Sequence, residues 1–192
     1  MHIAAYIVLA LAFGISNMLL FRRCAEPTPI RLSRGLLITL VVAAVQLALF
    51  LLGIVLGDLL RFEIPDDPDA FTKANALIFL GLDIFVMLRM LLPYLRREPK
   101  LPLFDLGSNK ACAAMAFASG INMLLVGLGA GFVATTADLH KIWPIIMLVL
   151  LWFLGYWGVM LGRRKVALRP IRWMLIAAIL LLGTAIAAMV NA

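Results

Sequence analysis

Most polar residues of this sequence lie in short breaks between long apolar runs, so few side chains inside the runs can carry chemistry. Carboxylates can bind cations or carry protons, while amides and hydroxyls offer neutral hydrogen-bond donors and acceptors. The side chains that we single out well inside the runs are Asn17, Gln46, Asp83, Arg89 and Asn122, with Ser16, Thr39 and Ser119 as lesser candidates. These residue types predict binding or transport rather than an enzyme, and they imply no cofactor.

Asp83 lies near the centre of the third run and is the deepest carboxylate. An unpaired carboxylate is costly in a membrane, so we expect it to face the interior, pair or titrate. Two interpretations stay open: a protonated acid that joins helices, and a cation ligand or proton carrier. The second is favoured because acids within membranes usually serve function. Arg89 lies about 240° further around a helix and does not share this face; its side chain can reach the interface.

Asn17 and Asn122 stand in two similar stretches, SNMLL at 16–20 and INMLL at 121–125. A single Asn in a membrane helix often only bonds to a neighbouring helix. Their matched positions favour a polar site near the middle of the membrane, which Gln46 could join. An amide suits a hydrated cation poorly, a polar solute better, and a bond between helices best.

The elements that must position these side chains are membrane-spanning helices. Of the 192 residues, 65% are hydrophobic and only 14% are charged, which is more apolar and less charged than soluble domains are. A spanning helix needs about 20 apolar residues, and continuous runs favour helices over strands. The six runs are 3–21, 36–60, 74–94, 111–132, 143–162 and 173–190. We therefore expect an all-α membrane protein with six transmembrane helices in a single membrane domain, 1–192.

The distribution of Lys and Arg predicts the orientation in the membrane. Four basic residues lie in the first break, four in the third and five in the fifth, whereas the second and fourth breaks hold only Arg61, Lys73 and Lys141. Cytoplasmic loops carry the excess of basic residues. Loops 1, 3 and 5 are therefore expected in the cytoplasm and both termini outside, in the inner membrane. The net charge of +7 then needs no nucleic-acid partner.

Three further features carry less weight. The acidic second loop, with Glu63, Asp66, Asp67 and Asp69, is interpreted as a solvated loop, although it could attract or release cations on the outer side. The two cysteines form neither a CxxC nor a zinc pattern. The first apolar run has no basic segment before it and no cleavage site after it, so we expect a retained helix.

Short matches recur at one spacing along the chain. NMLL occurs twice, 105 residues apart, and GIVLG (53–57) is followed by GVMLG (158–162) at the same distance. LIFLG (77–81) matches ILLLG (179–183) at nearly that distance. Helices one to three (1–98) are thus expected to repeat as helices four to six (108–192). Three spans per repeat make the two halves inverted, an arrangement common in secondary transporters.

These features resemble the manganese efflux pump (MntP) family of the lysine exporter (LysE) superfamily. The similarity rests on LAFGIS at 11–16, VQLALFLLGIVLG at 45–57, LIFLG at 77–81, INMLLVGLGAGF at 121–132 and GVMLGR at 158–163. The resemblance implies export of Mn²⁺ from the cytoplasm through an inverted-repeat bundle.

The sequence departs from this family at its metal-binding acids. Family members carry an Asp-Ala motif in the first helix of each repeat, and Asn122 stands at the second of these positions. At the first, Asn17 is the repeat equivalent, whereas alignment on Ser16 places Met18 there. Gln46 replaces the family's glutamate. The resemblance therefore leaves Asp83 as the charged metal ligand, with Asn17 and Asn122 as neutral metal ligands.

The leading expectation is a secondary transporter that exports a divalent metal cation, with Asn17, Gln46, Asp83 and Asn122 in the substrate pathway and Ser16 and Ser119 beside them. Amide ligands do not offset two positive charges, so the ion would stay largely hydrated or the substrate would differ. The alternatives are an exporter of a small polar or amino-acid-like solute, and a relative that has lost transport. A further alternative is a membrane thiol carrier that uses Cys24 and Cys112, one in each half.

Overall fold

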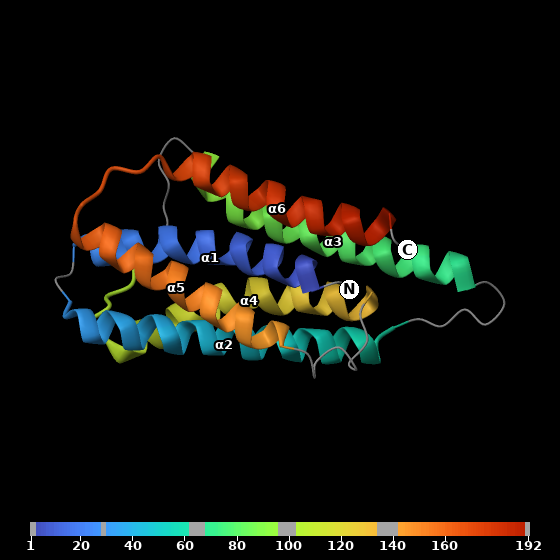
Figure 1. Ribbon diagram of the computed structural model, residues 1–192, viewed down its shortest axis with the longest axis horizontal. Helices are drawn as coiled ribbons and strands as arrows, with labels where there is room; N and C mark the ends of the chain where they lie inside the picture. Colours follow the sequence, from blue (N-terminus) through green and yellow to red (C-terminus); the bar gives the residue numbers. More distant parts are fainter. Residues whose placement is uncertain (1–2, 28–29, 62–67, 96–102, 134–141, 191–192) are drawn as a thin grey trace.

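The computed structural model describes residues 3–27, 30–61, 68–95, 103–133 and 142–190, and the described part is helical, with no strand. The described residues form six long helices, which Figure 1 shows packed side by side. They are α1 (Ile3–Ala25), α2 (Leu32–Leu59), α3 (Pro68–Leu95), α4 (Asn109–Val133), α5 (Trp143–Arg163) and α6 (Pro170–Val190). Each contains a stretch long and apolar enough to cross a membrane. The expected all-α class is therefore confirmed, and so are six helices that are long and apolar enough to span a membrane.

The helices extend beyond the apolar runs at several ends. α3 begins at Pro68, six residues before its apolar run, and α2 begins at Leu32 rather than at residue 36. Proline suits the first turn of a helix because the missing N–H would have no partner there. A run of apolar residues predicts only the part of a helix that lipid can cover. The backbone hydrogen bonds of the helix continue into the polar residues at its ends.

Successive helices run in opposite directions, so the connections alternate between the two ends of the bundle. In Figure 1 the ends of α1, α3 and α5 and the beginnings of α2, α4 and α6 lie toward the left, and α1 begins and α6 ends toward the right. We call the left end the basic end, because its described residues include Arg22, Arg23, Arg31, Arg34, Lys110, Arg163 and Arg164. This distribution fits the expected alternation of loops.

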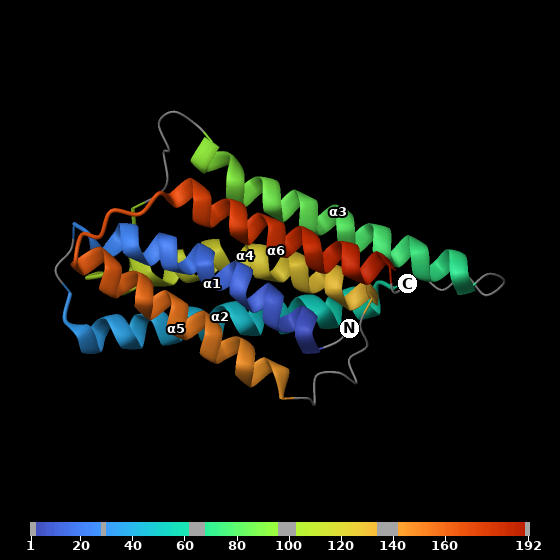
Figure 2. The ribbon, with the colours of Figure 1, turned by 45° about the horizontal axis from the view of Figure 1, so that its top comes forward.

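The helix pairs follow a regular pattern. The closest pairs are α2 with α4 and α1 with α5; α3 packs on α6 and α4, α1 packs on α6, and α2 packs on α5. Figures 1 and 2 both show α3 and α6 side by side. Exchanging the first three helices for the last three turns α2–α4 into α1–α5 and α3–α4 into α1–α6, and leaves α3–α6 and α2–α5 unchanged. The inverted repeat itself stays a prediction.

Glycines set the close approach of α2 and α4. A Cβ atom placed on Gly53 would clash with the backbone oxygen of Leu124 and lie 2.7 Å from the nitrogen of Leu128. Gly127 faces the backbone of Phe50 in the same way. Small residues let helices approach closely in membranes, where lipid is as apolar as the side chains. The GxxxG patterns of these two helices therefore pack against each other.

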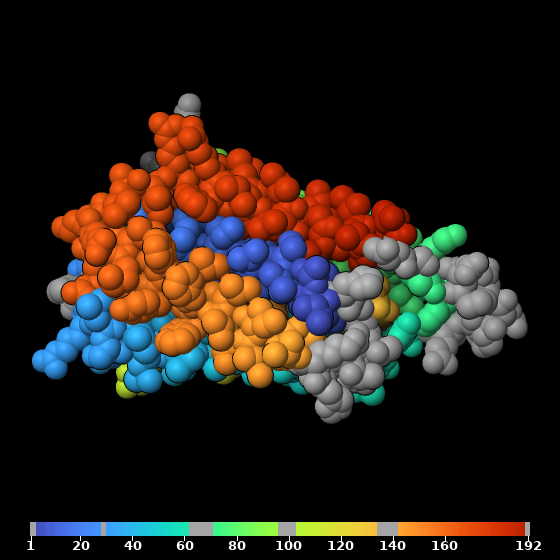
Figure 3. Space-filling view, viewed as in Figure 1, coloured from blue at the N-terminus to red at the C-terminus, as the bar shows by residue number. Residues whose placement is uncertain are grey.

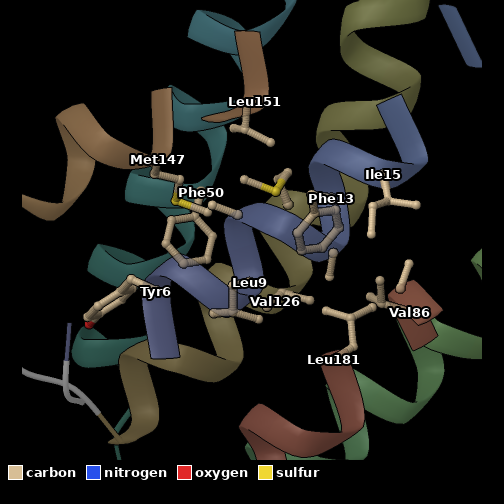
Figure 4. Packing of buried hydrophobic residues seen from close by; sticks show 14 of the residues in the cluster. Tyr6, Leu9, Phe13, Ile15, Phe50, Val86, Val126, Met147, Leu151 and Leu181 are labelled. Carbon is tan, nitrogen blue, oxygen red and sulfur yellow. The ribbon is translucent and has the colours of Figure 1, made fainter. Parts of the chain in front are cut away.

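The core fills the space among the helices with apolar side chains. Tyr6 stacks on Trp143 with 4.0 Å between ring centroids, and Phe50 meets the Trp143 ring edge-on at 6.0 Å. Figure 4 shows Phe50 beside Tyr6 within this packing. On the outside, α1, α5 and α6 form much of the face in Figure 3. α5 and α6 expose large apolar side chains such as Ile145 and Ile179, as lipid-facing helices do.

Candidate functional site

Three of the predicted site residues form one hydrogen-bonded cluster. Asn17 of α1 donates from Nδ2 to Gln46 Oε1 of α2 at 2.6 Å, and Gln46 Nε2 donates back to Asn17 Oδ1 at 2.9 Å. Gln46 Nε2 also donates to Ser119 Oγ of α4 at 2.8 Å. We call Asn17, Gln46 and Ser119 the amide cluster. The cluster joins three helices, as expected of polar residues that serve only to hold membrane helices together.

Burial explains why these groups pair. Asn17 and Gln46 are 3% and 1% exposed, so water cannot satisfy their amides from bulk solution. Ser119, which is half-buried, completes the cluster by donating to Met115 O of its own helix at 2.8 Å. Both N–H groups of Gln46 have acceptors. Gln46 can therefore donate a hydrogen bond to a substrate only by giving up one of these two bonds.

Asn122 is not part of the amide cluster, although the sequence suggested that Gln46 could join both asparagines. Its Oδ1 atom is buried and has no hydrogen-bond partner among the described residues. At the repeat distance of 105 residues, Leu151 stands where Gln46 would be needed to pair with it. The second half of the chain therefore lacks the amide that satisfies Asn17 in the first half.

Asp83 lies on α3 in apolar surroundings and is 1% exposed. Thr184 Oγ1 of α6 lies 3.4 Å from Asp83 Oδ2 and also donates to Leu181 O at 2.7 Å. Oδ1 of Asp83 is buried with no hydrogen-bond partner in the part of the chain that is described. The carboxyl group therefore has one long contact and one unused oxygen.

The wall around the middle of the bundle is contributed by four helices. Figure 4 shows Phe13 of α1, Val86 of α3, Val126 of α4 and Leu181 of α6 converging there. Val86 lies three residues after Asp83, and all four side chains are buried. A charge in such surroundings is expensive unless a cation or a proton accompanies it. This arrangement suits an acid that binds and releases a cation.

The described residues contain no group of three or more His, Cys, Asp or Glu side chains that could hold a metal ion. A metal at Asp83 would thus receive one carboxylate, with neutral oxygens or water as its other ligands. Such a set suits hard ions that prefer oxygen, and it suits a passing ion better than a tightly held one.

The remaining predicted residues take structural positions. Ser16 is half-buried beside Asn17 on α1, and Arg89 is exposed on α3, as a side chain that reaches the membrane interface would be. Thr39 is buried and donates to Gly35 O and Leu36 O of its own helix at 3.0 Å each. Glu63, Asp66 and Asp67 lie outside the described residues, as does the side chain of Asp69.

Both cysteines are free and lie in one packed cluster near the basic end. Cys24 of α1 is a buried member of this cluster, and Cys112 of α4 packs against it. Cys112 Sγ lies 3.8 Å from Leu106 O. Because both thiols lie near the same end of the bundle, the structure offers no pair of thiols at opposite ends for a thiol carrier.

Sequence reasoning missed two polar residues beside the predicted site. Thr184, the hydroxyl partner of Asp83, was passed over because a single Thr in an apolar run is common. Asn75 of α3 is 2% exposed, and neither polar atom of its side chain has a hydrogen-bond partner within the described ranges. Its position one residue inside the run 74–94 does not indicate whether its side chain is buried.

We compared the chain with known proteins in three ways, and no family model, no curated protein and no solved structure matches it.

Proposed function

We propose that this protein is a multi-pass membrane transporter that exports a cation, with Asp83 as the charged group in its pathway. The observation that carries this proposal is the buried Asp83 carboxyl, whose Oδ1 has no partner among the described residues. A purely structural acid would be expected to use both oxygens in hydrogen bonds, because unsatisfied buried acceptors are costly. A transport site, in contrast, keeps a ligand atom available.

The helix pairing supports a transporter with inverted repeats. The pairs α1–α5 and α2–α4 exchange with each other when the two halves are exchanged, and α3–α6 exchanges with itself. Transporters of this kind place substrate near the middle of the membrane, where the halves meet. The contact between Asp83 and Thr184 supports such a place for the site, because α3 and α6 would be the third helices of the two repeats.

The resemblance to manganese efflux pumps makes Mn²⁺ the first ion to test. Mn²⁺ prefers carboxylate, carbonyl and water oxygens. Asp83 would neutralise one of its two charges, and Asn17 and Asn122 could add only neutral oxygens. We therefore propose that the ion passes in largely hydrated form, from the basic end, which would face the cytoplasm, to the opposite end.

The amide cluster favours a second candidate, a related protein that no longer transports. Asn17, Gln46 and Ser119 bond to one another, as groups that only join helices do. The same pairing disfavours an exporter of polar solutes that would accept hydrogen bonds from Gln46, because both of its N–H groups already have acceptors. If the protein exports a cation, replacing Asp83 should change the amount of metal in the cell. If it no longer transports, the replacement should change nothing.

The experiment measures cell-associated manganese in a manganese-sensitive strain that lacks its own exporter. The strain carries the wild-type chain, Asp83→Asn, the control Glu26→Gln or an empty vector, at matched membrane levels. Glu26 is exposed beyond the end of α1, so its charge should not matter. We expect wild type and Glu26→Gln to lower manganese several-fold and Asp83→Asn to match the vector. Wild type equal to the vector would rule out manganese export.

A further inference from the structure

Three polar side chains of α3 and α4 carry buried atoms without hydrogen-bond partners among the described residues. These are both polar atoms of the Asn75 side chain, Oδ1 of Asp83 and Oδ1 of Asn122. The amide cluster shows that polar groups elsewhere in this bundle do pair when partners are present. The unsatisfied atoms of α3 and α4 therefore point to polar partners that come from outside the described chain.

The buried residues of α3 lie on one side of the helix. Asn75, Phe79, Asp83, Val86 and Met90 are 6% exposed or less and follow one another at intervals of three or four residues. Such intervals place side chains on one helix face. Asn75 and Asp83 thus share the face of α3 that looks into the bundle.

The third unsatisfied residue lies on the side of α4 that meets this face. A Cβ atom on Gly129 of α4 would lie 2.8 Å from Cδ2 of Phe79, so Gly129 marks the line of contact between the helices. Asn122 precedes Gly129 by seven residues, close to two full helical turns, and therefore lies on the same side of α4. Asn75 and Asp83 thus share the face of α3 that Phe79 places against α4, and Asn122 lies on the facing side of α4, while Thr184 of α6 also adjoins Asp83.

Asn75 and Asp83 cannot bind one ion together. Eight residues separate Asn75 from Asp83, which corresponds to about 12 Å along a helix. Oxygen ligands lie only about 2.0–2.6 Å from ions such as Mg²⁺ and Ca²⁺. They are therefore successive positions, with Asn75 nearest the end opposite the basic end, Asp83 in the middle and Asn122 beyond it.

We propose that the α3–α4 interface is a hydrated route for a cation, with Asn75 lining its outer part and Asp83 its midpoint. An amide oxygen can accept hydrogen bonds from the water around a cation and can also coordinate the cation directly. The Asn75 side chain is therefore suited to line such a route. The identity of the cation that follows this route rests on the proposed function. Access of water to Asn75 does not depend on it.

Phe79 divides the route in this conformation. Its ring is fully buried between the levels of Asn75 and Asp83 and packs against Gly129. Apolar constrictions stop ions by excluding water. Water from the end opposite the basic end should therefore reach Asn75 but not Asp83, unless the ring of Phe79 moves or is removed.

Cysteine labelling tests this directly. In a chain with Cys24→Ala and Cys112→Ala, single cysteines replace Asn75, Leu77 or Asp83, the last with and without Phe79→Ala. A charged, membrane-impermeant methanethiosulfonate reagent is added in metal-free buffer from the side opposite the basic end, and modification is followed by mass spectrometry. Leu77 is the matched control, because it is 52% exposed on the outside of α3 and meets lipid. Size-exclusion chromatography selects folded variants.

We expect Asn75→Cys to react about a hundredfold faster than Leu77→Cys, because a charged reagent is strongly disfavoured in lipid. Asp83→Cys should react as slowly as Leu77→Cys and become reactive with Phe79→Ala. Asn75→Cys reacting at the Leu77→Cys rate in folded protein would overturn the proposal. If Asn75→Cys does not fold, Asn75→Leu replaces it. If water reaches Asn75, Asn75→Leu should export the cation more slowly than wild type at an unchanged level of expression. Export by Asn75→Leu at the wild-type rate would overturn the route.

The two proposals fail separately. Reactive Asn75→Cys without manganese export contradicts the proposed function alone. Manganese export that depends on Asp83, together with unreactive Asn75→Cys, contradicts the route alone.

Discussion

Residue by residue, the polar groups of this bundle fall into two kinds. Asn17, Gln46 and Ser119 satisfy one another across three helices. Asp83 and Asn122 each retain a buried oxygen with no partner in the described chain. The first kind stabilises the packing of helices, and the second kind is available to a ligand. Substitutions should therefore separate stability from transport.

Gln46→Leu should lower thermal stability in detergent, because it leaves the Asn17 amide buried without its partner. Unsatisfied buried groups cost about 1–3 kcal/mol. The double variant with Asn17→Leu should recover part of this loss, since both polar groups are then gone. Measured unfolding of the two single variants and the double variant gives the coupling, which we expect near 1 kcal/mol. Strictly additive losses would show that the two amides do not pair.

Thr184→Val should reduce cation export several-fold without lowering the amount of folded protein, because it removes the hydroxyl beside Asp83 Oδ2. Thr184→Ser keeps the hydroxyl and should export at nearly the wild-type rate. Metal flux and size-exclusion profiles, measured on the same preparations, check both variants. Equal flux from all three proteins would remove Thr184 from the site.

Among the elements, the crossing of α2 and α4 depends most on small residues. Gly53→Ala would drive a methyl group into the backbone of α4 at Leu124 and Leu128. We expect a loss of about 1–3 kcal/mol, as for other overpacked sites. Gly81 of α3 and Gly183 of α6 have no atom within 4 Å of an added Cβ. Alanine at these two positions should leave stability unchanged or raise it by about 0.5–1 kcal/mol. Thermal unfolding of the three variants measures these changes in stability. Equal losses of stability in all three would contradict the close packing of α2 on α4 at Gly53.

Much of this element level can be predicted from the sequence, because apolar length determines which segments can cross a membrane. The alternation of basic breaks likewise agrees with the connections seen at each end. The rotation of each helix is less predictable. In α3 the spacing separates Asp83 from Arg89, and Asp83 is indeed buried and Arg89 exposed, but nothing in the sequence singles out Asn75 as a buried residue.

Side-chain partners are the least predictable part of the site. Gln46 bonds to Asn17 and Ser119 rather than to Asn122, because the pairing depends on where α1, α2 and α4 meet. Thr184 reaches Asp83 across 101 residues of sequence. A single sequence holds no signal for such a contact.

At the scale of the whole molecule, the two ends of the bundle differ in charge. Arg61, which follows α2, lies at the end opposite the basic end, and Arg164, which follows α5, lies at the basic end. We expect Arg61→Cys to react with an impermeant thiol reagent in intact cells, and Arg164→Cys only after the membrane is opened. Cys24 and Cys112 are replaced by alanine in both. The reverse pattern would invert the orientation in the membrane and turn export into import.

The most direct measurement is Mn²⁺ flux through the purified protein in liposomes, followed with a metal-sensitive dye inside. Wild type, Asp83→Asn and Glu26→Gln are reconstituted at equal density, beside empty liposomes. The account predicts flux for wild type and Glu26→Gln and none above empty liposomes for Asp83→Asn. Equal flux with and without the Asp83 carboxyl would contradict its central claim.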